Sequence, residues 1–128
     1  MAYEIDWIIP DKVTRQHISG EIKLEDLPAS FKEHAALLAN YPYEIHTIID
    51  LSDLTHYPTN LLKISQALNV KSPDNLGWMV FIGTSGTVRF LVKAVSQIIQ
   101  YRVRNADSIA EAIQFLKEQD TSLIEEVS

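Results

Sequence analysis

The chain has 128 residues, of which 46% are hydrophobic and 22% are charged, and it carries a net charge of −6 and no cysteine. This length predicts one domain with a core large enough to fold without a disulfide or a structural metal. The lack of cysteine excludes disulfides, thiolate metal sites and cysteine nucleophiles, and the excess of acid argues against a nucleic-acid partner, because phosphate binding needs lysine and arginine.

The first forty residues predict a hairpin followed by a helix. Alternating apolar residues predict a strand over 3–9, a turn over 10–12 and a second strand over 13–19. The short connection between the two strands favours antiparallel pairing. Helical spacing over 24–40 then places four side chains on the core side of a first helix: Leu27, Phe31, Ala35 and Leu38.

Strands and helices alternate through the rest of the chain. Continuous β-branched or apolar runs predict strands over 44–51 and 78–82, and a shorter strand follows over 101–105. A loop over 52–58 is expected to lead into a helix over 59–68, with Thr59 as its N-cap. Two further helices are predicted. The first follows the turn Gly83-Thr84-Ser85-Gly86 and has an apolar stripe formed by Val88, Leu91, Val92, Val95, Ile98 and Ile99. The second begins after a cap at Asp107 or Ser108.

This order of elements predicts the fold class. Alternating strands and helices indicate parallel crossovers, and the opening hairpin makes the sheet mixed. We therefore expect an α/β protein with a mixed five-stranded sheet and four helices in a single domain over 1–120. A flexible tail is predicted over 121–128.

The ends of the chain and its hydropathy bear on location. Met1–Pro10 carries two acids and no basic residue, unlike a signal peptide, and no apolar run is long enough to span a membrane. These observations predict a cytoplasmic protein without a membrane partner.

Charge is unevenly distributed along the chain. The segment 75–106 holds no acidic residue and four basic ones, so it carries +4 while the remainder carries −10. These basic residues, Arg89, Lys93, Arg102 and Arg104, are predicted either to form a solvated face that pairs with nearby acids or to form a basic patch for an acidic partner or a second copy of the chain.

The turn Gly83-Thr84-Ser85-Gly86 has two interpretations. Small residues between a strand and a helix let backbone amides approach an anion, so the turn is a candidate ligand loop. The alternative is a tight strand–helix connection, because the turn lacks the lysine of a phosphate-binding loop and the spacing of a dinucleotide motif.

Catalytic chemistry is not predicted. Ser85 does not stand in a Gly-x-Ser-x-Gly motif, and the four histidines show no spacing typical of a zinc site. We therefore predict no catalytic residue, no metal site and no cofactor, and we keep a hydrolase only as a minor alternative.

Three segments resemble the STAS-like superfamily, which includes bacterial anti-sigma-factor antagonists and the domain appended to sulphate transporters. They are Ile18-Ser19-Gly20-Glu21-Ile22, the run Ile48-Ile49-Asp50-Leu51-Ser52-Asp53-Leu54, and Tyr101-Arg102-Val103 followed by Asp107-Ser108-Ile109-Ala110-Glu111-Ala112-Ile113. The resemblance spans roughly residues 13–119. It implies a non-catalytic regulatory module that binds a kinase, an anti-sigma-like protein or a sensor.

The resemblance also implies a site. The phosphorylatable antagonists carry Asp-Ser-Ser-Gly at the start of the second helix, where this sequence has Pro58-Thr59-Asn60-Leu61. Thr59 falls at the position of the phosphoacceptor serine, but the aspartate and the glycine are absent. The predicted partner-binding residues are Asp50, Ser52, Asp53, Thr59 and Asn60.

Two alternatives stay open beside this interpretation. A hydroxyl at position 59 is also expected of a plain N-cap that satisfies one helix amide. A small-ligand or lipid-binding module would need a pocket under the Gly83 turn, or between Trp78, Phe81 and the helices. The sequence leaves a homodimer open.

Overall fold

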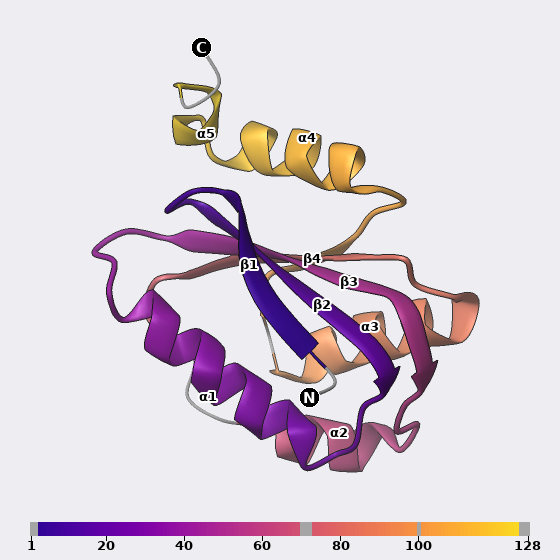
Figure 1. Ribbon diagram of the computed structural model, residues 1–128. Helices are drawn as coiled ribbons and strands as arrows, with labels where there is room; N and C mark the ends of the chain where they lie inside the picture. The colour runs from indigo at the N-terminus through magenta and orange to yellow at the C-terminus, as the bar shows by residue number, and fades with distance from the viewer. Residues whose placement is uncertain (1–2, 70–72, 100, 126–128) are drawn as a thin grey trace.

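The computed structural model describes residues 3–69, 73–99 and 101–125. Five strands form one sheet in the order in which they occur along the chain (Figure 1). They are β1 (Tyr3–Ile9), β2 (Val13–Glu21), β3 (Ile45–His56), β4 (Leu76–Ile82) and β5 (Val103–Asn105). The first pair is antiparallel and the other three pairs are parallel. The predicted mixed five-stranded sheet is therefore confirmed.

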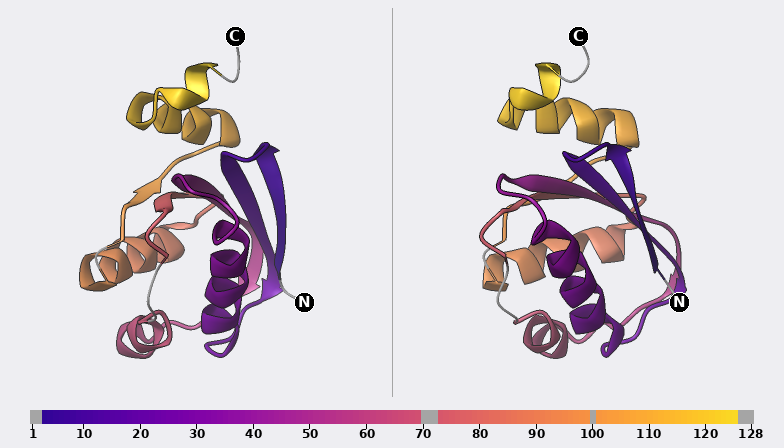
Figure 2. Two further views of the ribbon diagram at one scale, coloured as in Figure 1. Left: turned by 90° about the vertical axis from the view of Figure 1, so that its left-hand side faces the viewer. Right: turned by 60° about the vertical axis from the view of Figure 1, so that its left-hand side comes forward.

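Helices cover both faces of this sheet, as the views in Figure 1 and Figure 2 show. One face carries α1 (Asp26–Leu38), α2 (Leu61–Ala67) and α3 (Gly86–Ile99). The opposite face carries α4 (Ile109–Gln119) and the short helix α5 (Ser122–Glu125). Each face has its own apolar core, because a strand buried on both sides sends alternate side chains to the two helix layers.

The third strand is longer than predicted. It continues to His56, where the sequence indicated a loop from Ser52 onward. The reason is pairing with the end of β2: Ser19 lies opposite Asp53, and Glu21 lies opposite His56. The predicted site residues Asp50, Ser52 and Asp53 therefore lie on a strand.

The predicted N-cap of the second helix, Thr59, was also wrong. Helix α2 begins at Leu61, and its N-cap is Asn60, whose Oδ1 accepts the amide of Lys63 at 3.0 Å. At α4 the prediction left Asp107 or Ser108 as the cap, and the structure has Ser108, whose Oγ accepts the amide of Glu111 at 3.1 Å. An asparagine side chain satisfies a free helix amide as well as threonine does, so local propensity could not decide between positions 59 and 60.

Two further differences concern the last third of the chain. The stripe predicted for α3 is buried at Val88, Leu91 and Val95, but Ile98 is 58% exposed, and the side chain of Ile99 lies outside the described residues. Where the sequence predicts a flexible tail, Ser122–Glu125 form α5, and the side chain of Leu123 is fully buried in the core beneath α4. No helix in the described ranges is both long and apolar enough to cross a membrane.

Candidate functional site

Asp50 lies near the carboxyl end of the buried part of β3 and is itself buried. Its Oδ1 accepts the hydroxyl of Ser52 at 2.6 Å and the Ser52 amide at 3.0 Å, and its Oδ2 accepts Nη2 of Arg15 at 3.0 Å. Burial alone would raise the pKa of Asp50, but the hydrogen bonds from Ser52 and Arg15 outweigh it and hold the pKa below the usual range. Asp50 is thus an ionised group that braces β2 against β3.

Asp53 has a different environment on the same strand. It is exposed, and its Oδ2 lies 2.7 Å from Nε2 of His17 on β2. The five predicted partner-binding residues therefore divide: Asp50 is buried in a polar cluster, whereas Ser52, Asp53, Thr59 and Asn60 are exposed.

Thr59 stands immediately before the cap of α2. Its side chain is exposed, and within the described part of the chain its hydroxyl makes no hydrogen bond, because Asn60 supplies the cap. Beside it lies a surface hollow of about 550 Å³, lined by 21–24 from the end of β2 and the segment before α1, and by 55–59 from the end of β3 and the segment before α2. The position that resembles the phosphoacceptor is therefore open to another molecule.

The Gly83 turn is pressed against β3. Gly83 has a φ of +69°, and a Cβ at this position would lie 2.5 Å from the amide nitrogen of Ser52. The hydroxyls of the turn are used locally: Ser85 Oγ accepts the Val88 amide at 3.4 Å, and Thr84 Oγ1 accepts Nε of Arg89 at 3.3 Å. The described contacts are those of a tight strand–helix connection, and the anion-loop interpretation stays a prediction.

Replacing Gly83 with alanine is expected to lower the free energy of unfolding by roughly 2 kcal/mol, because L-residues disfavour this φ and the methyl group would meet the backbone of β3. Urea unfolding measures the loss. The matched control is Gly86→Ala, where an added Cβ meets nothing within 4 Å. Equal stability of the two variants would show that the turn is not packed on β3.

The four basic residues of the positive segment have different partners. Arg89 Nη2 lies 3.0 Å from Asp107 Oδ1, and Arg102 Nη2 lies 2.7 Å from Glu44 Oε2. Arg104 lies over the ring of Phe115 at 4.7 Å, and Lys93 is exposed on α3. Arg102 and Arg104 lie over aromatic rings of the α4 face, and Arg89 reaches from α3 to Asp107, which directly precedes the α4 cap. The basic patch stays a prediction.

A buried histidine, which the sequence analysis did not single out, joins three elements. His46 on β3 is 1% exposed; its Nδ1 accepts the amide of Trp78 at 2.9 Å, and its Nε2 donates to Asp120 Oδ2 at 2.9 Å. Asp120 Oδ1 in turn accepts the hydroxyl of Ser122 at 2.7 Å. These residue types occur in hydrolases, but here the serine bonds to the aspartate and not to the histidine, so the cluster ties α4 and α5 to the sheet and activates no nucleophile.

Metal-binding residues do not converge in the part of the chain that the structure describes. There, no group of three or more histidine and acidic side chains could hold a metal ion. The histidines instead have separate partners: His17 pairs with Asp53, His34 with Thr14, and His46 with Asp120.

Comparison with solved structures identifies the fold. No family model and no curated protein matches the sequence. A protein from Shewanella loihica, described as a DUF3478 family member with a SpoIIAA-like fold, superposes with a TM-score of 0.64 at 16% identity, covering 90% of this chain and 92% of its own. The anti-sigma factor antagonist SpoIIAA in its unphosphorylated form superposes with a TM-score of 0.61 at 14% identity, covering 91% of this chain and 97% of its own.

The two superpositions each span about nine-tenths of the chain. At this level of identity they establish fold and do not transfer activity. The resemblance to STAS-like domains is thereby confirmed for the architecture: the chain has the SpoIIAA-like α/β fold.

Proposed function

We propose that this protein is a non-catalytic regulatory module that binds a partner protein through one surface at the start of α2. This α2 surface consists of Thr59, Asn60 and Leu62, together with the hollow beside Thr59. Ser52 and Asp53 lie on the strand that leads to it. The partner is a regulatory protein, such as a kinase, an anti-sigma-like protein or a sensor.

The observation that carries the proposal is the combination of a free hydroxyl with exposed apolar side chains. Leu62 is 68% exposed on α2, and Phe90 is 62% exposed on α3, which packs against α2. Large apolar side chains beside a polar rim are typical anchors of protein interfaces. SpoIIAA, which shares this fold, is an anti-sigma factor antagonist, and that role supports a protein partner.

Thr59 is the proposed control point of this surface. Its exposed hydroxyl is accessible to a kinase, although the local sequence Pro-Thr-Asn-Leu lacks the aspartate and glycine of the usual motif. A phosphate here would add close to two negative charges at the edge of the hollow. Such a charge would repel an acidic partner or recruit a basic one, so the same surface would have two binding states.

Affinity capture from extract of the source cells tests the surface. We expect the wild-type chain to retain one regulatory protein and Leu62→Asp to lose it, because a carboxylate replaces an apolar anchor. Thr59→Glu, which imitates the modification, is expected to change the recovery of the same protein, whereas Thr59→Val is expected to leave it unchanged. Quantitative mass spectrometry measures each recovery and also detects phosphate on Thr59.

The matched control is Ile124→Asp. Ile124 is 52% exposed, comparable with Leu62, but lies on α5 at the opposite face of the sheet. Recovery of the same partner by the Leu62→Asp and wild-type chains alike would disprove the α2 surface, and loss with Ile124→Asp alone would move the interface to the other face.

A further inference from the structure

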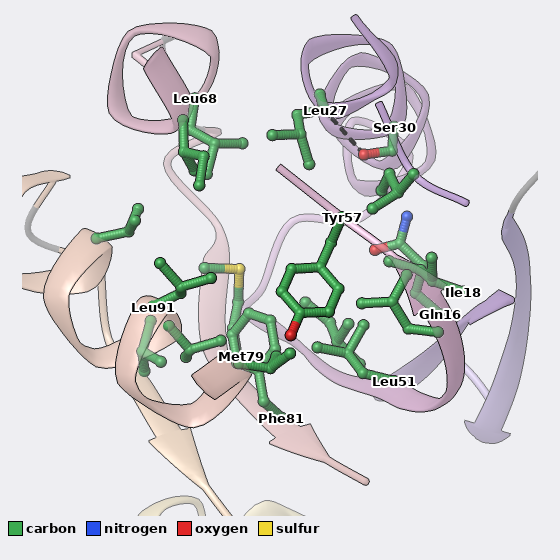
Figure 3. A pocket seen from close by; sticks show the side chains of 18 of the residues that line it. Gln16, Ile18, Leu27, Ser30, Leu51, Tyr57, Leu68, Met79, Phe81 and Leu91 are labelled. Atoms are coloured by element: carbon green, nitrogen blue, oxygen red, sulfur yellow. Dashed lines mark hydrogen bonds between the residues drawn. The ribbon is translucent and has the colours of Figure 1, made fainter. Parts of the chain in front are cut away.

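A partly open cavity of about 150 Å³ lies between the sheet and helices α1, α2 and α3 (Figure 3). Its floor comes from β2, β3 and β4, and its walls from the three helices and from Tyr57 and Pro58. Most of the lining side chains are aliphatic or aromatic, among them Ile49, Leu51, Met79, Phe81, Leu91 and Val95. The sequence suggested a pocket under the Gly83 turn or between Trp78, Phe81 and the helices. Phe81 lines the cavity, but Gly83 and Trp78 do not, and Trp78 packs against Phe115.

One buried polar atom of this apolar cavity lacks a hydrogen-bond partner within the described part of the chain. Gln16 on β2 is 7% exposed, and its Nε2 makes no hydrogen bond. Figure 3 shows the Tyr57 ring reaching into the middle of the cavity toward the strands that carry Met79 and Phe81. Ser30 differs from Gln16, because its hydroxyl donates to the carbonyl of Leu27 at 2.9 Å.

An unpaired donor in an apolar interior destabilises the fold unless something accepts its hydrogen bond. Gln16 lines this cavity and has an unpaired Nε2, so an acceptor oxygen placed beside that atom can satisfy it. No lining residue carries a charge, which disfavours a carboxylate or an ammonium group. A cavity of about this volume, when lined by leucine, isoleucine and phenylalanine, holds a molecule the size of benzene.

We propose that this cavity is a binding site for a small uncharged molecule, with one aromatic ring or a short aliphatic body and one acceptor oxygen such as a ketone. The apolar body contacts the side chains of β3, β4 and α3, and the oxygen accepts a hydrogen bond from Gln16 Nε2. The proposal does not depend on the α2 surface, although Tyr57 and Pro58 directly precede Thr59 and would bring a bound molecule into contact with that segment.

Three probes of similar size test the proposal on the full chain. Acetophenone supplies the ring and the carbonyl oxygen, cumene has the same shape without the oxygen, and benzoate replaces the ketone with a charge. Calorimetric titration is expected to give acetophenone a dissociation constant about three- to tenfold below that of cumene, in line with the usual worth of a hydrogen bond. Benzoate is expected to show no saturable binding.

A variant at the donor separates this site from nonspecific apolar binding. Gln16→Leu is expected to retain cumene and to reduce the preference for acetophenone. It is also expected to raise the melting temperature of the free protein, since it removes an unsatisfied buried amide. Equal affinity of wild type for acetophenone and cumene, no binding of either, or a preference that survives in Gln16→Leu would overturn the proposal.

Discussion

Replacing His46 with alanine is expected to lower the free energy of unfolding by about 4 kcal/mol, which is large for a single substitution. The ring fills a fully enclosed space and makes two hydrogen bonds, so its removal leaves a cavity and an unpaired Trp78 amide. It also frees Asp120, whose link to His46 ties α5 to β3. Urea unfolding at neutral pH measures the change.

The sheet explains why this histidine is there. The pairing of β3 with β4 shifts register between Ile45 and Thr47, and this irregularity leaves Gly77 and Trp78 opposite His46. The His46 ring accepts a hydrogen bond from the Trp78 amide, which the β3–β4 ladder does not use. Position 77 requires glycine, because an added Cβ would overlap the His46 ring.

A double-mutant cycle provides the control. Gly77→Ala alone is expected to destabilise the fold, because its methyl group displaces the ring. In the double variant with His46→Ala, the same methyl group enters space that the ring has left. The loss of stability in the double variant is therefore expected to be smaller than the sum of the losses in the two single variants. Strict additivity would show that His46 and Gly77 do not share this space.

Stability is expected to fall between pH 7 and pH 4 because of His34 on α1. This side chain is 7% exposed, and burial lowers its pKa from 6.5 to about 4. Above pH 6.5 the ring is neutral in both the folded and unfolded states; below it, the unfolded chain binds a proton that the folded chain does not. The contribution of His34 is therefore lost as pH falls, by about 2 kcal/mol at pH 5 and about 3 kcal/mol at pH 4.

His34→Gln isolates this effect. A glutamine keeps an N–H near the position of Nε2, which lies 3.1 Å from Thr14 Oγ1, but does not titrate. Subtracting the stability of the variant from that of wild type at each pH removes the contribution of Asp50 and Asp120, whose pKa values are both lowered in the fold. A difference that stays constant from pH 7 to pH 4 would contradict the burial of His34.

Periodicity along the chain was sufficient to predict the order of the elements, the opening hairpin and the mixed sheet. These features depend on residues close in sequence, such as the alternating side chains of 3–9 and the Ser108 cap. The extension of β3 depends instead on pairing with β2, whose partner residues lie more than thirty positions away in the chain. A local pattern contains no information about such a partner.

The same limit applies to the buried polar groups. Helical spacing favoured Leu27, Phe31, Ala35 and Leu38 for the core side of α1. Leu38 is buried as predicted, but the other two buried positions of the helix are the polar residues Ser30 and His34. A polar residue in the interior needs a distant partner: His34 bonds to Thr14 on β2, and His46 bonds to Asp120, 74 positions away. Gln16, whose amide nitrogen lacks a partner in the cavity, escaped notice for the same reason.

The candidate site was predictable in part. The resemblance placed attention on Thr59 and Asn60, and the structure finds both exposed beside a hollow. The exchange of roles between them, with Asn60 as the cap, was not predictable, since both side chains suit that position. The exposure of Leu62 and Phe90 depends on how α2 packs on α3, which no single helix pattern specifies.

Site-specific photocrosslinking in the source cells tests the proposed partner-binding surface most directly. A benzophenone amino acid is placed at position 62 on the α2 surface, and at position 124 on the opposite face as the control. We predict that illumination joins position 62 to one regulatory protein and that position 124 gives no such product. A product at position 124 with none at position 62, or none at either, would contradict the proposed function.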